Sequence, residues 1–156
     1  PYVPGLLSFR ESPAGLEVWE KLRTRPDCLI CDGHGYAHPR RFGFACHFGL
    51  LVNLPTIGFA KSVLVGNFEC PGQTRGSVTD LVDAGEIIGA AVRTRKGAEP
   101  VFVSVGYRIS LATAVSTILA CTSGYRIPEP VRRAHALVNR LRESGTEPPI
   151  RGSLFA

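Results

Sequence analysis

The sequence predicts a single α/β domain, and three observations support that prediction. Apolar runs of strand length alternate along the chain with segments of helical period. Polar and glycine residues gather where the predicted strands end, which is where open α/β sheets place their ligands. With 156 residues, 44% of them hydrophobic, the chain is long enough to bury one core. We expect the domain to span residues 1–143 and a loose tail to follow over 144–156.

Composition and charge narrow the function classes. No apolar run is long enough to cross a membrane, and no secretory signal opens the chain. The five cysteines are odd in number and scattered, which indicates a reducing, cytoplasmic location. The net charge of +5 and a pI of about 9.2 favour a polyanionic partner. The chain starts at Pro1 and contains no methionine, which indicates a fragment or a processed start.

The first elements are a short strand and a helix. Residues 2–7 are apolar and interrupted by prolines, a pattern typical of an edge strand. Ser8 and Glu11 fit a capping box, so we expect a helix from Ser8 through Leu22. Glu11 therefore has two interpretations, as the cap of this helix or as a carboxylate that serves a site.

The stretch from residue 26 to residue 41 is central to the prediction. Cys28 to Cys31 form a short apolar run that predicts a strand covered on both faces, and Asp32 emerges at its end. A glycine-rich turn, histidines and two arginines follow, so the stretch is either a plain turn or a site that handles phosphate. Cys28 and Cys31 form a C-x-x-C, but an odd spacing on a strand points the two thiols to opposite faces. We therefore expect them in the core rather than in a zinc or redox site.

The middle of the chain predicts a helix, a strand and a loop. Residues 42–52 are apolar nearly all round, which predicts a buried helix in which His47 is either a hydrogen-bonded core histidine or, less favoured, a ligand. Residues 54–60 predict another buried strand, and Lys61 at its end is either a solvated terminus or a phosphate contact. The polar, glycine-bearing residues 66–80 predict a mobile surface loop.

The last third predicts a hairpin and two helices. Residues 86–93 and 101–105 predict two antiparallel strands, and Ser110 can cap a helix that runs to Cys121. The final helix has an apolar stripe that we expect to face inward and that includes His135. An inward histidine is either a hydrogen-bonded core residue or a ligand. The stripe consists of Val131, Ala134, Val138 and Leu141.

The candidate site collects Glu11, Asp32, Lys61 and His135, with arginines nearby. Carboxylate oxygens suit Mg²⁺, which keeps several waters and lets a phosphate supply other ligands. Such an ion generates hydroxide and neutralises charge that develops on phosphate. The sequence contains neither a Walker A motif nor a Gly-x-Ser-x-Gly elbow, which disfavours P-loop hydrolases and serine esterases.

Four blocks of sequence resemble the endonuclease V family, the deoxyinosine-specific repair nucleases. They occur in the family's order and cover residues 1 to about 142. The blocks are residues 1–11 (PYVPGLLSFRE), 32–41 (DGHGYAHPRR), 55–61 (PTIGFAK) and 126–130 (RIPEP).

The resemblance implies a ribonuclease-H-like mixed sheet flanked by helices. It also implies Mg²⁺-dependent cleavage of the second phosphodiester bond 3′ to deoxyinosine, with Mn²⁺ as an alternative ion. Glu11, Asp32 and His135 match metal-binding positions. Lys61 and His38 match positions near the scissile phosphate, so the implied catalytic set is Glu11, Asp32, Lys61 and His38. The implied partner is inosine-containing DNA, with RNA as an alternative because base-pocket residues do not contact the 2′-OH.

The same resemblance implies how the lesion is recognised. The first four residues match a wedge that separates strands, with Tyr2 stacking where the base was, and extrusion is cheapest at damaged or mispaired bases. Glycines in the base pocket let backbone groups approach a base edge. The wedge is Pro1, Tyr2, Val3 and Pro4, and the pocket is Gly5, Leu7, Gly33, Gly35 and Leu64.

This chain departs from the family pattern at its start. The family's first metal-binding aspartate lies on an early strand ahead of the wedge, so the first strands of the expected sheet are absent here. A second hypothesis follows, a non-catalytic module that binds inosine-containing or distorted nucleic acid. A third is an α/β protein with no polynucleotide partner, which would show no salt-sensitive retention on DNA.

Overall fold

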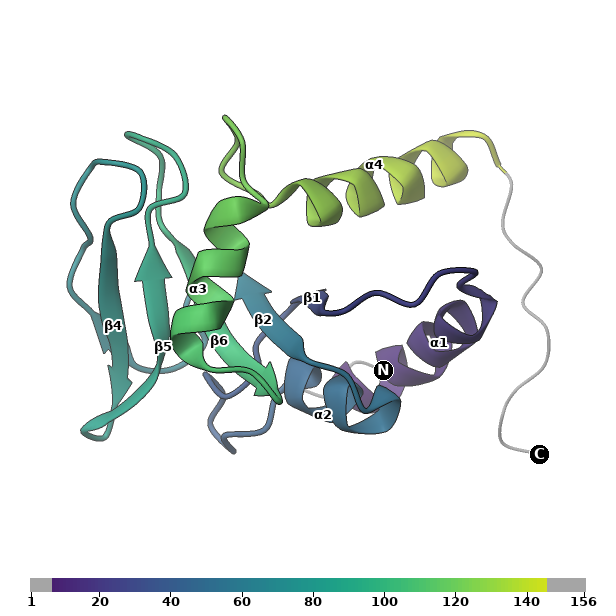
Figure 1. The fold of residues 1–156 in the computed structure, drawn as a ribbon, viewed down its shortest axis with the longest axis horizontal. Coiled ribbons are helices and arrows are strands. Elements are labelled where there is room, and N and C mark those ends of the chain that lie inside the picture. The colour runs from purple at the N-terminus through teal and green to yellow at the C-terminus, as the bar shows by residue number, and fades with distance from the viewer. Residues whose placement is uncertain (1–6, 146–156) are drawn as a thin grey trace.

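A computed structural model describes residues 7–145 as four helices and one mixed sheet (Figure 1). Pro1 to Leu6 and residues 146–156 lie outside the described part, and with them lie the predicted wedge, most of the predicted first strand and most of the tail. The elements are α1 (Leu7–Lys21), β1 (Leu29–Asp32), α2 (Phe44–Val52), β2 (Thr56–Ala60), β3 (Asn67–Phe68), β4 (Val78–Asp83), β5 (Glu86–Val92), β6 (Val101–Tyr107), α3 (Leu111–Ala120) and α4 (Glu129–Glu143).

The six strands lie in the order β1-β2-β6-β5-β4-β3. β1 and β2 are parallel, and the other neighbouring strands are antiparallel. The predicted antiparallel pair is confirmed, because Ala90 of β5 lies opposite Val103 of β6. β2 is buried at all five of its residues, as its continuous apolar run predicts.

Helices cover the two faces of the sheet. α3 packs on one face, where Ala114 and Ile118 join the main core with Ile57 and Phe59 of β2. α2 packs on the other face, where the Thr56 hydroxyl donates to the Ala45 carbonyl at 2.6 Å. Ser110 caps α3 as predicted, since its side chain accepts from the Thr113 N–H.

The two cysteines of the C-x-x-C, Cys28 just before β1 and Cys31 within it, lie on opposite faces of the sheet, as predicted. Cys28 packs against the core under α3, and Cys31 belongs to the cluster under α2. Burial raises the pKa of the Cys31 thiol to about 12. The thiol therefore stays protonated and packs as a small apolar group.

One strand prediction holds only in part and another was wrong. β1 packs on both faces, with Ile30 against the main core and Cys31 in the cluster under α2, but Leu29 and Ile30 are only partly buried. Residues 66–80, predicted as a mobile loop, include β3 and the first part of β4. β4 escaped prediction because only Leu81 in it is fully buried and its other five residues are exposed or partly exposed.

Two helix predictions also need correction. Ser8 lies inside α1 rather than before it, so it is not the N-cap and the capping-box interpretation of Glu11 is wrong. In α4 only Val131 of the predicted inward stripe is buried, whereas Val138 and Leu141 are 53% and 41% exposed. The second half of α4 extends past the edge of the sheet, so described residues do not cover it (Figure 1). Within residues 7–145, no helix is long and apolar enough to cross a membrane.

Candidate active site

The segment after β1, residues 33–43, is called the glycine loop here, and it crosses one face of the sheet. The Gly33 N–H donates to the Phe59 carbonyl of β2 at 2.8 Å, and the Tyr36 N–H donates to the Val105 carbonyl of β6 at 2.7 Å. Ala37 is buried against the sheet in a second core cluster. The loop is therefore fixed to two strands rather than being a free surface turn.

The two glycines of this loop have different surroundings. A Cβ on Gly35 would lie 2.1 Å from the Val105 carbonyl oxygen, so any side chain there would force backbone atoms apart. A Cβ on Gly33 would come no closer than 3.7 Å to Phe44. Gly35 is thus needed for packing, whereas Gly33 is partly exposed and a side chain there would make only ordinary van der Waals contacts.

Three of the predicted site residues meet at the end of β1. Asp32 is the last residue of that strand, and its Oδ2 lies 2.7 Å from His135 Nε2 of α4. The same oxygen accepts from Lys61 Nζ, just after β2, at 3.2 Å. All three side chains are about 40% exposed, so a solvated phosphate could reach them. His135 therefore contacts a carboxylate rather than the apolar core.

The other predicted site residues lie apart from this cluster. Glu11 is exposed on α1, and within the described ranges nothing joins it to Asp32. His38 accepts a hydrogen bond at Nδ1 from the Arg40 N–H, and partial burial followed by the charge of Arg40 lowers the pKa of its imidazole. Leu64 is 54% exposed in the loop after β2. Leu7 begins α1, while Pro1, Tyr2, Val3, Pro4 and Gly5 lie outside the described part.

The residues at the end of β1 fit a divalent ion in part. Asp32 offers a carboxylate and His135 an imidazole, and Mg²⁺ accepts as few as one or two carboxylates when waters and phosphate complete its shell. Residues 7–145 contain no group of three His, Cys, Asp or Glu side chains arranged to hold a metal ion. A firmly held ion therefore needs at least one further ligand.

Sequence reasoning missed an arginine that positions Lys61. The Arg126 guanidinium donates to the carbonyls of Lys61, Glu99 and Pro100 at distances of 2.9 to 3.0 Å. The available signal was the position of Arg126 in the RIPEP block, where nearby prolines stiffen the chain.

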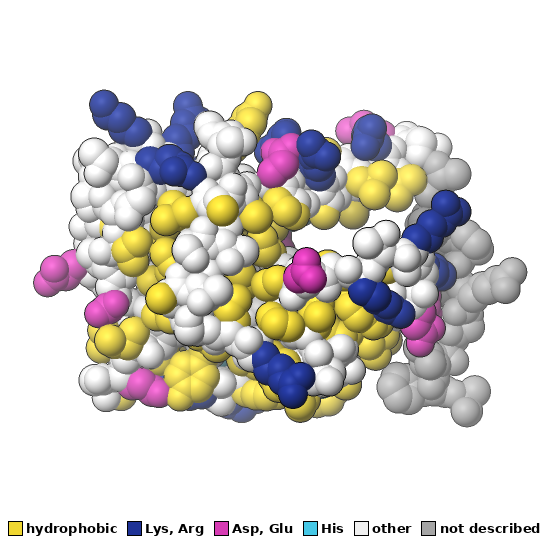
Figure 2. Space-filling model, in the orientation of Figure 1, with side chains coloured by type: hydrophobic (Ala, Val, Ile, Leu, Met, Phe, Trp, Pro, Cys, Tyr) yellow, Lys and Arg dark blue, Asp and Glu magenta, His cyan; other side chains and the backbone are white. Residues whose placement is uncertain are grey.

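An open groove of about 910 Å³ runs along β1 and reaches Asp32 and His135. Figure 2 shows hydrophobic side chains gathered beneath α4 on this side of the molecule. The lining of the groove is mostly apolar and includes Leu29 and Ile30 of β1 and Val131 of α4. Among the described residues no strand pairs with the outer edge of β1, and this edge borders both an apolar groove and the polar cluster.

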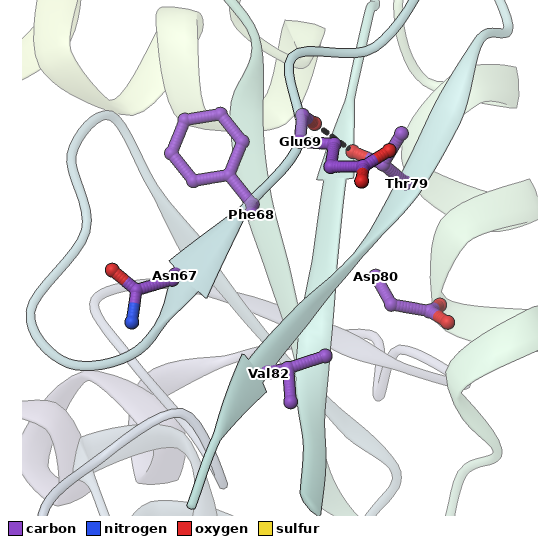
Figure 3. Close-up of a pocket in the computed structure, with 6 residues that line it drawn as sticks. All are labelled: Asn67, Phe68, Glu69, Thr79, Asp80 and Val82. Atoms are coloured by element: carbon purple, nitrogen blue, oxygen red, sulfur yellow. Dashed lines mark hydrogen bonds between the residues drawn. The ribbon is translucent and has the colours of Figure 1, made fainter. Parts of the chain in front are cut away.

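A second hollow lies at the opposite edge of the sheet. Figure 3 shows it between β3 and β4, where the Thr79 hydroxyl donates to the Glu69 carbonyl. Its charged members are Glu69 and Asp80, which disfavours a phosphate ligand there. The end of β1 is therefore the better candidate for chemistry.

Comparison with known proteins identifies the family that this chain resembles. The family model described as Endonuclease V matches residues 1–136. The chain is 56% identical over 142 residues to an endonuclease V of Roseiflexus sp., covering 91% of this chain and 64% of the relative. This chain thus spans slightly less than two thirds of the length of such relatives.

Solved structures show the same fold. The endonuclease V of Streptomyces avermitilis matches with a TM-score of 0.89 at 49% identity, over 94% of this chain and 64% of that one. The Ciona intestinalis endonuclease V matches with a TM-score of 0.79 at 28% identity, over 92% and 68% of the two chains. That protein was crystallised with DNA containing an inosine followed by a ribo-adenosine.

Proposed function

Because this chain belongs to the endonuclease V family, we propose that it is the greater part of a metal-dependent DNA repair endonuclease. The ribonuclease-H-like class predicted from the sequence agrees with its solved relatives. The proposed reaction is hydrolysis of the second phosphodiester bond 3′ to a deoxyinosine, in the cytoplasm.

The observation that carries this proposal is the meeting of Asp32, Lys61 and His135 at the end of β1. Asp32 and His135 would hold Mg²⁺ or Mn²⁺, which supplies an activated water and neutralises charge on the phosphate. Lys61 carries a positive charge that would contact the scissile phosphate, with Arg126 holding its backbone. His38, at the outer part of the glycine loop, is proposed as a second phosphate contact.

Recognition of the lesion is proposed for the glycine loop and the first residues of the chain. The partly exposed backbone at Gly33 would approach the edge of an extruded hypoxanthine, and the exposed Leu64 would border it. Gly35 would support this pocket by letting the loop pack on β6. The segment from Pro1 to Pro4 is proposed as the wedge, with Gly5 and Leu7 as further pocket residues. DNA is the proposed substrate, and inosine-containing RNA is the alternative.

The metal site also requires a carboxylate beyond the pair at Asp32 and His135. We propose that Glu11 supplies one when substrate and metal are bound, and that a strand added at the free edge of β1 supplies an aspartate. The apolar groove along β1 suits such a strand, because the strand would cover Leu29, Ile30 and the exposed face of α4.

The test is cleavage of an end-labelled duplex with one deoxyinosine. It uses residues 1–156 and a longer chain that carries the remaining third of a relative. Asp32→Ala in the longer chain should slow nicking at least about a hundredfold, since a metal ligand is lost. Asp80→Ala, which removes an exposed aspartate at the opposite edge of the sheet, should cut at the wild-type rate. Equal rates for Asp32→Ala and wild type would refute the assignment.

A second candidate function is a module that binds inosine-containing nucleic acid without cutting it. The absence of a three-ligand metal group within residues 7–145 favours it. Tight binding of inosine DNA without nicking by the longer chain, even with Mn²⁺, would support this module over the enzyme. Either function predicts binding that weakens steeply with salt, because basic residues release counterions from phosphate.

A further inference from the structure

The far end of the glycine loop is tied to the turn between β4 and β5 by two ion pairs. Arg41 Nε lies 2.7 Å from Glu86 Oε2, and Arg41 Nη2 lies 2.8 Å from Asp83 Oδ2. The Tyr36 hydroxyl donates to the other oxygen of Glu86 at 2.5 Å. Two loop residues, one on each side of His38, are thus joined to the same carboxylate.

The same arginine also contacts the histidine segment directly. The Arg41 N–H and its Nη1 both donate to the His38 carbonyl, at 2.8 and 3.2 Å. One guanidinium therefore connects the backbone at His38 to a turn more than forty residues away in the sequence. The backbone hydrogen bonds that the loop donates to the sheet precede this stretch, at Gly33, Gly35 and Tyr36.

The backbone at Arg41 is held in an unfavourable conformation. Its φ is 52°, in the left-handed region that costs most L-residues about 1 kcal/mol. Such a conformation persists when surrounding contacts outweigh its cost. The ion pairs oppose this cost, and the hydrogen bonds that Arg41 donates to Glu86 and Asp83 raise the pKa of its guanidinium, so its charge is retained.

We propose that Arg41, Tyr36 and Glu86 form a clamp that positions His38 and the pocket side of the glycine loop for an inosine-bearing strand. This inference rests on the proposed function. Arg41 and Glu86 are positioning residues, because they act through the loop and face the β4–β5 turn rather than the end of β1. Partly exposed ion pairs contribute little to global stability, so the clamp should affect ligand preference more than folding.

Four single substitutions separate an effect of the clamp on ligand preference from an effect on folding stability. Arg41→Gly removes the guanidinium and also relieves the left-handed strain, so the two changes in stability offset each other. Glu86→Gln keeps an acceptor for Tyr36 but loses the ion pair. Arg41→Lys keeps the charge but cannot contact both carboxylates in the planar geometry of arginine. Ala84→Gly is the control, because it relieves a φ of 51° in the β4–β5 turn and removes none of the side chains that form the clamp.

The first readout is the ratio of affinities for two single-stranded oligonucleotides, one with a deoxyinosine and one with deoxyguanosine in its place. Fluorescence anisotropy should show this ratio reduced about tenfold in Arg41→Gly, Arg41→Lys and Glu86→Gln, with melting temperatures near that of wild type. The double variant Arg41→Gly with Glu86→Gln should be no worse than the poorer single one, because both break one clamp. Ala84→Gly should keep the wild-type ratio.

The second readout, hydrogen exchange of the free protein, does not depend on the ligand. Exchange should rise in residues 36–43 of the clamp variants and stay unchanged in β2 and β6. A wild-type protein without preference for inosine would overturn the proposed function, and exchange would still decide whether the clamp exists. Clamp variants with wild-type exchange in the loop, or with a wild-type affinity ratio in an inosine-selective protein, would overturn the clamp.

Discussion

The glycine loop and helix α4 both carry predicted site residues, but they are held in very different ways. The loop donates hydrogen bonds to β2 and β6, buries Ala37 and is tied to the β4–β5 turn by Arg41. In α4 only Val131 is buried, and the contact between His135 and Asp32 joins two partly exposed side chains. One half of the site is fixed by packing, and the other half depends on few contacts.

This difference indicates which half of the site would change more if a further segment of chain packed against it. The loop already has partners for its backbone and its buried residues, so added structure has little to supply there. α4 exposes Leu137, Val138 and Leu141 beyond the part of the helix that lines the groove along β1. Covering these side chains would stabilise α4 and hold His135 against Asp32 more firmly.

The largest expected effect comes from comparing the two glycines of the loop. Gly35→Ala should destabilise the fold by about 3 kcal/mol or more, because its Cβ would meet the Val105 carbonyl, which is backbone and cannot turn away. Gly33→Ala should cost less than about 1 kcal/mol, since its Cβ meets only ordinary contacts. Urea denaturation followed by circular dichroism measures both.

A binding measurement on the same pair sharpens the comparison. Gly33→Ala should fold normally and still lose affinity for an inosine-containing oligonucleotide, because the methyl group enters the space proposed for the base. If Gly33→Ala bound inosine as tightly as wild type, the base pocket would have to lie elsewhere. If Gly35→Ala were as stable as wild type, the loop would not be packed as tightly as its contacts with β6 indicate.

The next-largest effect is expected from a comparison of two valines of α4. Val131→Ala should cost roughly 2 kcal/mol, because Val131 is only 5% exposed and belongs to the main core. Val138→Ala should change the stability by less than about 0.5 kcal/mol, since that side chain is 53% exposed. Thermal melting tests both variants. Equal losses would show that the second half of α4 is covered in solution, for example by a second copy of the chain.

The local elements were largely predictable from the sequence. The continuous apolar run of β2, the amphipathic residues of α1 and the Ser110 cap each have signals within a few neighbouring residues. The blocks that resemble the family also contain Asp32, Lys61 and Arg126, which the fold places together. Proximity of Asp32 and Lys61 followed from strand ends meeting at one edge of a sheet, whereas Arg126 lies between α3 and α4 and its role was not predicted.

Features that depend on distant partners were not predictable. Arg41 finds its carboxylates at Asp83 and Glu86, and no local periodicity connects these positions. The exposure of Val138 escaped prediction for the opposite reason, since an apolar stripe predicts burial whether or not a partner element is present. An apolar pattern indicates which side chains can be buried, and the tertiary structure determines whether a partner element covers them.

The smallest expected effect is a pH dependence that the packing of the glycine loop creates. Burial lowers the pKa of His34 below its usual 6.5, and the charge of nearby His38 lowers it further, while a hydrogen bond to the Ser62 backbone opposes the shift. The unfolded chain therefore takes up a proton at higher pH than the folded chain does. Stability is unaffected above pH 6.5 and falls as the pH drops from 6.5 toward the lower folded value.

His34→Gln should flatten this decline by removing the group that resists protonation. Since His38 is shifted in the same direction, the double variant with His38→Gln should be flatter still. Urea denaturation at pH 7.5, 6.5 and 5.5 measures the slope. A wild-type slope in both variants would mean that the loop admits solvent to its histidines. The glycine loop would then be as loosely held as α4, and the difference between the two halves of the site would disappear.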